Sequence, residues 1–540
     1  MDLSSYVRCS VISACAILAV NLVYLPAWAA ETEVIQVQFE TSCSDAVQSE
    51  FNEAITLLHS FEYPETTRRF NQIIEKDPTC AMARWGAAMS IWHPLWAPPS
   101  KAELEQGANI LADSDGLQTT PREAAYINAA KAFFSSNDIK THRRRAEMFE
   151  VRMADLYAEN LDDPEAAAFY ALALLASADP RDKSYTHQFK AAGLLNWVRE
   201  SHPTHPGVLH YLIHSYDYPG LAHLALESAK IYADAAPDSA HAQHMPSHIF
   251  TRLGLWERSL ASNHDSTRSA AEYTIRAHLP GHYDEGLHSM DYLMYAMLQT
   301  ARDDEANALL DTLHGIGKTD TENFKVAFTY ASAPARYALE RRRWEEASNL
   351  ELKPAEFLWD DFPWARSIHH FARGIGAARS GQLTRAKEEL AIIEKLWAGI
   401  PDSTHTYFRE EVKVHVDAVT SWILLAEGNS DQALQMAAAA ADREDAIDKH
   451  PVTPGEVIPA RELFADMLFE SGKHAMSLQQ YLAVLSGSPN RLNALLGAGN
   501  AASRTGDDAL AEQFFAQARK QTKAGNRQRT GLDKAWTRSR

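Results

Sequence analysis

Apolar residues recur along the chain at the three- and four-residue spacing of amphipathic helices, and no stretch predicts a sheet. Alanine-rich helical segments follow one another and are separated by short turns at Gly, Asp-Pro or Asn. Residues 51–78 are typical of one helical pair, and residues 165–176 form a helix that begins after Asp163 and Pro164. The segment 93–99 interrupts the pattern because its three prolines cannot continue a helix. We therefore predict an all-α protein.

Two stretches, at 203–263 and 465–519, repeat with a period of 34 residues. In the first stretch, four pairs of residues keep this interval: Pro203 and Pro237, Gly220 and Gly254, His210 and His244, His214 and His248. A period of 34 with Gly at the middle turn and Pro at the close is that of the tetratricopeptide repeat (TPR). Such units cannot bury their apolar faces alone and must stack. The expected architecture is a TPR-like helix-turn-helix solenoid.

The chain divides into four predicted parts. Residues 1–30 are a signal peptide, and residues 31–314 form an N-terminal TPR-like array that carries the histidine motifs. The polar segment 315–323 is the expected hinge or boundary, and residues 324–519 form a C-terminal TPR-like array. Residues 520–540 are a basic tail, which we expect to be solvated.

Three finer features resemble a group of exported bacterial TPR proteins whose activity is unassigned. They are the run from residues 57–61 (LLHSF) through 80–83 (CAMA) to 93–96 (HPLW), the motif HYLIH at 210–214, and the motif HMPSHIF at 244–250. The likeness covers roughly residues 40–310. It implies a fold and a set of motifs but no reaction. The resemblance to TPR proteins also implies a concave groove that binds a protein or peptide partner, with the histidines along its inner face.

The N-terminus is typical of a Sec signal peptide. Residues 11–25 are almost wholly apolar, Arg8 precedes them, and Ala27-Trp28-Ala29 is a small-x-small cleavage pattern. No later segment is apolar enough to cross a bilayer, so we expect no transmembrane segment in the mature chain. The predicted location is the periplasm or the outside of the cell.

Charge and cysteines narrow the choice of partner and compartment. The formal net charge is −19, which argues against nucleic acid because a phosphate backbone requires a basic surface. Cys9 and Cys15 lie in the predicted signal peptide, and Cys43 and Cys80 remain. In an oxidising compartment this pair predicts a disulfide, with two buried thiols as the alternative.

The first histidine pair lies on one face of a predicted helix. His210 and His214 are one turn apart, on the stripe beside the apolar positions that begin at Leu209. Stacked repeats place equivalent helices on the order of 10 Å apart. Imidazoles of this pair can therefore converge with those of His244 and His248 in the next repeat.

The later histidines are less regular. A proline inside a helix costs ~3 kcal/mol, so Pro246 predicts that the helix begins near Met245, with His244 at its mouth. A further helix is expected over residues 285–300, and His288 near its start is the fifth candidate ligand. His278 and His282 keep the 34-residue spacing but bracket Pro280-Gly281, which predicts a loop without a ligand pair.

Neutral imidazole is the commonest metal ligand in proteins. An all-nitrogen site of His210, His214, His244, His248 and His288 suits a transition metal such as zinc, copper, nickel or iron, and the sequence does not choose among them. A histidine-lined groove for an organic ligand and purely structural histidines remain the alternatives.

Three function classes follow. The first is a periplasmic interaction scaffold that binds a protein or peptide in its groove. The second is a metal-binding protein for storage, sensing or delivery of zinc, copper or iron. The third is a metalloenzyme that uses the histidine cluster with an open coordination position and an acid or base such as Asp217 or Asp291.

Overall fold

Helices account for all the regular structure of the residues that the computed structural model describes, which are 37–96, 98–237, 239–401, 406–447, 452–527 and 529–537. The predicted signal peptide lies outside these residues. The only extended pairing among them is an isolated bridge between His282 and Thr319. No helix of these residues is long and apolar enough to cross a membrane. The prediction of an all-α fold is confirmed.

The helices of the first part of the chain are α1 (Asp45–His59), α2 (Tyr63–Lys76), α3 (Ala81–Met89), α4 (Lys101–Ala112), α5 (Pro121–Phe133), α6 (His142–Glu159), α7 (Pro164–Ser177), α8 (Thr186–Ser201), α9 (Pro206–Tyr216), α10 (Leu226–Ala235), α11 (Ala240–His244), α12 (Pro246–Arg252), α13 (Trp256–Arg276), α14 (Asp284–Gln299) and α15 (Asp303–His314). Those of the second part are α16 (Phe324–Glu340), α17 (Trp344–Ser348), α18 (Pro363–Arg379), α19 (Leu383–Gly399), α20 (Thr406–Ala426), α21 (Ser430–Asp445), α22 (Ala460–Glu470), α23 (His474–Gly487), α24 (Leu492–Arg504), α25 (Asp508–Gln521) and α26 (Leu532–Thr537). Short 3-10 helices span Ile139–Thr141, Ala222–Ala225 and Trp359–Asp361.

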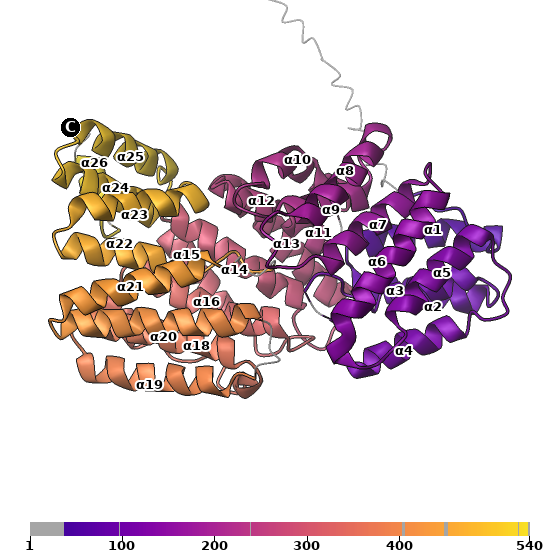
Figure 1. Cartoon of the computed structure of the whole chain (residues 1–540), viewed down its shortest axis with the longest axis horizontal. Helices are drawn as coiled ribbons and strands as arrows, with labels where there is room; N and C mark the ends of the chain where they lie inside the picture. Colours follow the sequence, from indigo (N-terminus) through magenta and orange to yellow (C-terminus); the bar gives the residue numbers. More distant parts are fainter. Residues whose placement is uncertain are drawn as a thin grey trace, which may run out of the picture. The chain divides into compact units, whose positions relative to one another are not determined.

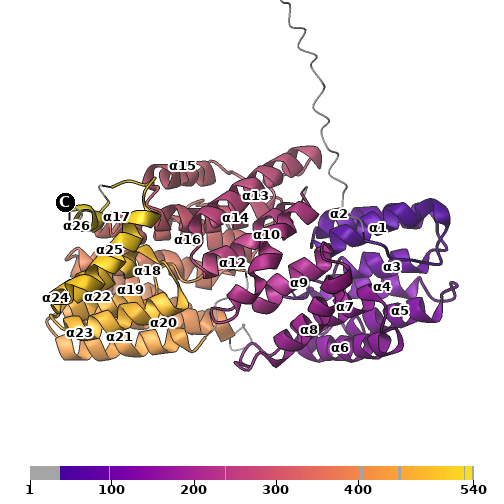
Figure 2. The ribbon, with the colours of Figure 1, turned by 90° about the horizontal axis from the view of Figure 1, so that it is seen from above.

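Neighbouring helices in the sequence pack against each other, as α7 does on α8 and α24 on α25 (Figure 1). Alternate helices also contact, as α14 and α16 do, so each helical pair stacks on the next. The view from above places α13 beside α14 and α14 beside α16 (Figure 2). This is the packing of a TPR-like helix-turn-helix solenoid.

Small and aromatic residues at repeat positions allow the paired helices to approach closely. A Cβ atom on Gly499 would lie 2.7 Å from a ring carbon of Phe515, so only glycine fits at this crossing. Gly472 and Gly506, 34 residues apart, both have positive φ angles, 74° and 89°, in the turns between helices. These turns require glycine because other residues adopt that backbone conformation at a cost. The 34-residue register of the sequence is therefore the register of the turns.

The apolar core does not divide at the expected boundary. One cluster of buried residues runs from Val37 to Phe250, and a second runs from Trp256 to Leu468. The second cluster contains Leu313 and Val326, which lie on either side of the polar segment 315–323. That segment is a surface loop over a continuous core, because α14 and α16 pack together directly across it.

The end of the chain is also more ordered than a solvated tail. Leu532 and Ala535 of α26 are fully buried and share a cluster with Phe515 of α25. Arg529 is 3% exposed, and its guanidinium donates to the backbone oxygens of Leu298 and Glu340, at the C-terminal ends of α14 and α16. Carbonyls at helix ends have no partner within the helix, and this arginine supplies one. The prediction of a solvated basic tail is wrong for this segment.

Cys43 and Cys80 are bonded, with the sulfurs 1.98 Å apart and the Cα atoms 4.7 Å apart. The bond ties the segment before α1 to the start of α3. This is the pairing that the two cysteines of the predicted mature chain indicated.

Candidate metal centre

Helix α9 carries the first histidine pair. Pro206 occupies its first turn, and the side chain of His205 caps it by accepting from the backbone N–H of Val208 (3.3 Å). Every residue of the helix is buried, because neighbouring helices cover it on all sides. His210 and His214 are therefore 0% and 8% exposed, whereas the expected TPR groove would be open to solvent.

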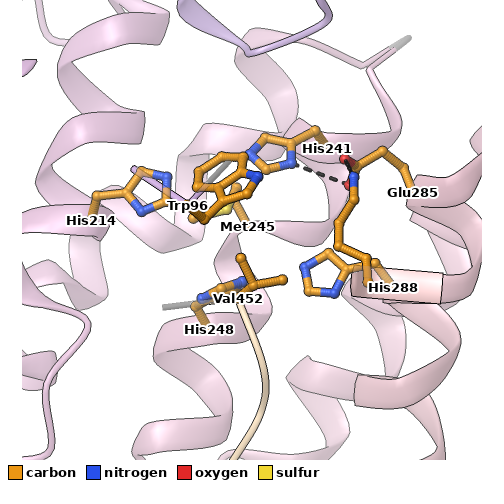
Figure 3. A pocket seen from close by; sticks show the side chains of 9 residues that line it. Trp96, His214, His241, Met245, His248, Glu285, His288 and Val452 are labelled. Atoms are coloured by element: carbon orange, nitrogen blue, oxygen red, sulfur yellow. Dashed lines mark hydrogen bonds and ion pairs between the residues drawn. The ribbon is translucent and has the colours of Figure 1, made fainter. Parts of the chain in front are cut away.

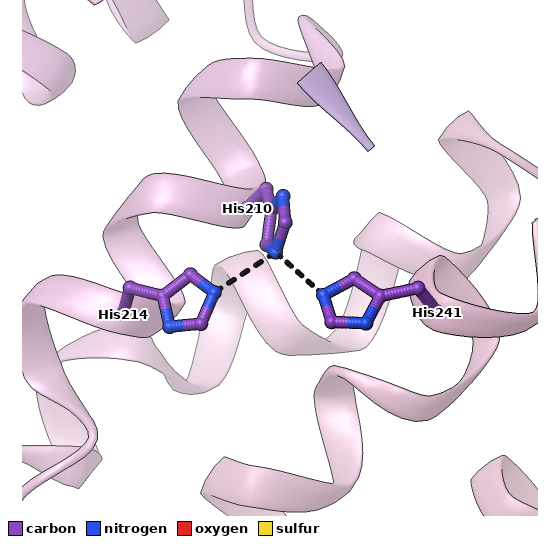
Figure 4. A group of neighbouring side chains, drawn as sticks. All are labelled: His210, His214 and His241. Atoms are coloured by element: carbon purple, nitrogen blue, oxygen red, sulfur yellow. Dashed lines mark hydrogen bonds between the residues drawn. The ribbon is translucent and has the colours of Figure 1, made fainter. Parts of the chain in front are cut away.

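His210, His214 and His241 form the first triad (Figure 4). Nε2 of His210 lies 3.0 Å from Nε2 of His214 and 3.3 Å from Nε2 of His241. The first two residues come from α9, and His241 comes from α11. The triad thus joins two successive repeats.

His244, His248 and His288 form the second triad. Nε2 of His244 lies 3.0 Å from Nε2 of His248, and the ring centre of His288 is 4.2 Å from that of His244. As expected, a helix begins beside Met245: α12 starts at Pro246, with Met245 as its N-cap. The short helix α11 before it was not expected, and the helical angles of Met245 (φ −53°, ψ −37°) join α11 to α12. The one-turn spacing of the two histidines survives for this reason.

Hydrogen bonds to the other ring nitrogen determine which nitrogen of each histidine carries the proton. Nδ1 of His210 lies 2.7 Å from the backbone oxygen of His59, and Nδ1 of His248 lies 2.9 Å from Oδ2 of Asp217. A carbonyl or carboxylate oxygen only accepts, so both Nδ1 atoms donate. A neutral ring has one proton, and Nε2 of each histidine is left with a lone pair.

His244 has the same tautomer. Its Nδ1 lies 2.7 Å from Oδ1 of Asn263, whose Nδ2 donates to the backbone oxygen of Ser259 (2.8 Å). The amide oxygen therefore faces the ring and accepts its proton. Nε2 of His244 therefore bears a lone pair, which faces Nε2 of His248 at 3.0 Å.

Two facing lone pairs repel unless a cation lies between them. A metal ion 2.0–2.1 Å from each of two nitrogens, at tetrahedral or trigonal angles, separates them by about 3.3–3.6 Å. The spacings in the two triads, 3.0 and 3.3 Å, are close to that range. Hydrogen-bonded Nδ1 atoms are also the usual outer support of metal-bound histidines.

Burial opposes protonation of three of the rings. The pKa values of His210, His244 and His288 lie well below the usual 6.5, chiefly because burial disfavours the charged imidazolium. Neighbouring histidines lower these pKa values further. These three rings are therefore neutral near pH 7.

A small cavity of about 10 Å³ is lined by residues of both triads (Figure 3). Its lining consists of Trp96, His214, His241, Met245, His248, Glu285, His288, Lys325 and Val452. The space holds about one water molecule. Lys325 and Val452 come from the second part of the chain, so the site is closed by residues remote from it in sequence.

The carboxylates beside the rings are already paired. Burial alone would raise the pKa of Glu285, but Lys325 forms an ion pair with it and the net pKa is well below the usual value. Its Oε2 lies 3.4 Å from Nδ1 of His241. Asp217 accepts from Nε of Arg252 (3.0 Å) as well as from His248. Neither carboxylate is needed as a direct metal ligand.

In a third group, the polar atoms pair with one another; its members are His59, Glu165 and His205. The two oxygens of Glu165 each lie 2.7 Å from Nε2 of one histidine. Burial alone would raise the pKa of Glu165, but both histidines lower it below the usual value. Both Nε2 atoms donate to this carboxylate, which makes a structural network. Its effect on the centre is to hold the His59 carbonyl that accepts from His210.

The structure brings together all five histidines that the sequence singled out, and adds His241. Sequence reasoning missed His241 because the helix was expected to begin after it. The available signal was its position three residues before His244, which places both on neighbouring faces of one helix turn. Asp291, the other acid considered, accepts from Ser332 (2.7 Å) and does not contact a triad. His278 lies outside any helix, as predicted for its loop.

No protein-family model matches the sequence, and no curated protein matches it. Among the solved structures that match, the human IFIT1 dimer with m7Gppp-AAAA is 13% identical, covers 85% of this chain and 94% of that chain, and has a TM-score of 0.38. The TPR domain of P58(IPK) is 14% identical, covers 69% of this chain and 98% of that chain, and has a TM-score of 0.21. TM-scores this low carry no argument about function, so the description of the site rests on the helices and histidines alone.

Proposed function

We propose that the chain is a metal-binding protein in which six buried histidines hold transition-metal ions inside a TPR-like scaffold. The observation that carries the proposal is the contact between Nε2 of His244 and Nε2 of His248, at 3.0 Å. When the rings are neutral, both nitrogens bear lone pairs because the rings donate through Nδ1. A metal ion between two such nitrogens would stabilise the pair.

The chemistry of the donors supports a transition metal. Six imidazoles without a carboxylate suit zinc, copper or iron, whereas calcium and magnesium require oxygen ligands. The two triads, His210/His214/His241 and His244/His248/His288, give each ion three nitrogens. Three protein ligands leave a fourth position for a small molecule, which is the arrangement of reactive sites.

The proposal includes export, on the grounds of the signal peptide at residues 1–30. Metal loading in the periplasm or outside the cell fits a chain whose two remaining cysteines are bonded. An interaction scaffold for a protein or peptide is the competing function. It requires no metal and tolerates loss of the histidines.

The decisive measurement is metal content of the purified chain after loading with zinc, copper or iron. We expect two ions per chain in the wild type and none in a His210→Ala/His244→Ala double variant, with circular dichroism unchanged. His264→Ala, an exposed histidine on α13, is the matched control and should keep both ions. Equal metal content in wild type and double variant, or no metal in either, would overturn the proposal and leave the scaffold.

A further inference from the structure

We infer that Trp96 is the gate of the metal centre: its indole closes the histidine cavity toward solvent and must turn aside for an ion to enter or leave. This inference rests on the proposed function and adds a conformational step to it. Three observations carry it: the size of the cavity, the burial of its walls and the contacts of the indole.

The cavity is too small to admit an ion together with its bound water. Its volume is about 10 Å³, which is the space of one water molecule. A metal ion in solution carries several bound water molecules, so it cannot pass into this space unless part of the wall moves. Metal exchange at the triads therefore requires an opening of the structure, of the kind that lids and loops provide in other closed sites.

Most of the wall is buried and held in place. Of the nine lining residues, only Trp96 and Lys325 are partly exposed. The ammonium of Lys325 forms ion pairs with Asp284 (2.8 Å) and with Glu285, which fix it at the start of α16. Trp96 lies outside any helix, on the connection between α3 and α4. Segments with few fixed contacts open at the lowest cost, so Trp96 is the part of the wall that moves first.

The indole covers the first triad. Its ring centre lies 5.7 Å from that of His241 and 5.8 Å from that of His214, and Figure 3 shows it between these two rings. A further ring contact joins it to Phe61, at 5.4 Å. Rotation of the tryptophan side chain breaks these packing contacts without unfolding a helix. It exposes the cavity at the edges of two metal-binding rings.

A gate changes rates and leaves the equilibrium as it is. The ligands of the bound ion are the same with and without the indole, and an equilibrium shifts only when the two states are stabilised differently. Removal of the indole should therefore speed metal uptake and metal loss by the same factor. If the indole instead supported the bound ion, its removal would speed loss alone and weaken binding.

The test uses the full chain, with zinc, copper and iron each offered alone. Stopped flow measures uptake, and transfer to an excess of a chromogenic chelator measures loss. We expect both rates to rise at least about tenfold in Trp96→Ala, with the dissociation constant unchanged. Trp96→Phe keeps a smaller ring and should give intermediate rates. Trp197→Ala removes a tryptophan that is 44% exposed on α8, and this matched control should leave both rates at the wild-type values.

Other outcomes separate this inference from the proposed function. Unchanged rates in Trp96→Ala, or faster loss with weaker binding, would overturn the gate and leave a metal-binding protein. If circular dichroism shows that Trp96→Ala does not fold, Trp96→Phe decides, and wild-type rates in that variant would overturn the gate. Failure of the wild type to bind zinc, copper or iron at all would overturn both.

Discussion

Two buried polar clusters in this chain differ in how their hydrogen-bonding groups are paired. In the histidine cluster, ring nitrogens face ring nitrogens: Nε2 of His210 lies 3.0 Å from Nε2 of His214, and Nε2 of His244 lies 3.0 Å from Nε2 of His248. In the arginine cluster, Nη2 of Arg491 lies 2.6 Å from Glu340 and its Nε 2.6 Å from Glu462, while Nη1 donates to the hydroxyl of Tyr295 (3.0 Å). Both clusters are almost fully excluded from water.

The two clusters differ in whether hydrogen-bond donors face acceptors. Burial alone would lower the pKa of Arg491, but Glu340 and Glu462 raise it well above the usual value, so Arg491 stays charged and its donors face acceptors. In the histidine cluster, the closest polar contacts join one imidazole nitrogen to another. A self-satisfied cluster joins helices, here α14, α16, α22 and α24. A cluster that is satisfied only by an added cation is a binding site.

Breaking the arginine cluster should give the largest change. Arg491→Met leaves Glu340 and Glu462 buried without their cation, which should lower the free energy of unfolding by about 3–5 kcal/mol. Urea denaturation measures this loss. Metal content per folded chain should stay at the wild-type value, because no triad residue contacts the cluster.

The matched control is Lys230→Met, which removes a surface ion pair with Glu227 (2.6 Å). Such a pair contributes at most about 1 kcal/mol. Arg491→Lys keeps the charge and should lose less stability than Arg491→Met. An equal loss in the surface and buried variants would contradict the structural role given to the arginine cluster.

Acid should destabilise the metal-free chain through the histidine cluster. The folded-state pKa values of His210, His244 and His288 lie below 6.5. Below that pH, the unfolded chain therefore binds more protons than the folded chain does. Stability is complete above pH 6.5 and falls as the pH drops. Each histidine contributes at most about 1.4 kcal/mol per pH unit, roughly 4 for the three.

Urea denaturation at pH 7.5, 6.5 and 5.5 measures this slope. His288→Leu should reduce it by about one histidine's share, and His264→Ala should leave it unchanged. A slope that is the same in His288→Leu and wild type would show that the histidine cluster does not titrate as its burial requires.

The smallest of the three effects concerns the partner of one ring. Asn263→Ala removes the acceptor at Nδ1 of His244, and we expect metal affinity to fall about 10- to 100-fold. Asn263→Asp keeps an oxygen there and should retain the affinity. Competition with a chromogenic chelator measures both. Asn109→Ala, an exposed residue on α4, is the control; a loss of affinity there, or none in Asn263→Ala, would contradict the assigned tautomer.

Much of the candidate site could be predicted because its spacing is local. His210 and His214 share a helix face whatever packs around them, and the 34-residue period carries the relation to His244 and His248. His241 could not be recognised because no helix was expected before Pro246. Proline has no N–H to donate to the preceding turn, but Met245 keeps helical angles and joins α11 to α12.

The sequence by itself determined the helices, their turns and the positions of the histidines along them, since periodicity and glycine turns depend on neighbours in the chain. Only the tertiary structure decided that these rings are buried, which nitrogen of each carries a proton, and that two triads share a cavity. The protonation of the rings depends on the acceptors at their Nδ1 atoms, which are Asn263, Asp217 and the His59 carbonyl. The cavity depends on Lys325 and Val452, which help to line it. Burial and hydrogen bonding set the protonation of an imidazole, and the groups that impose them come from segments far apart in the chain.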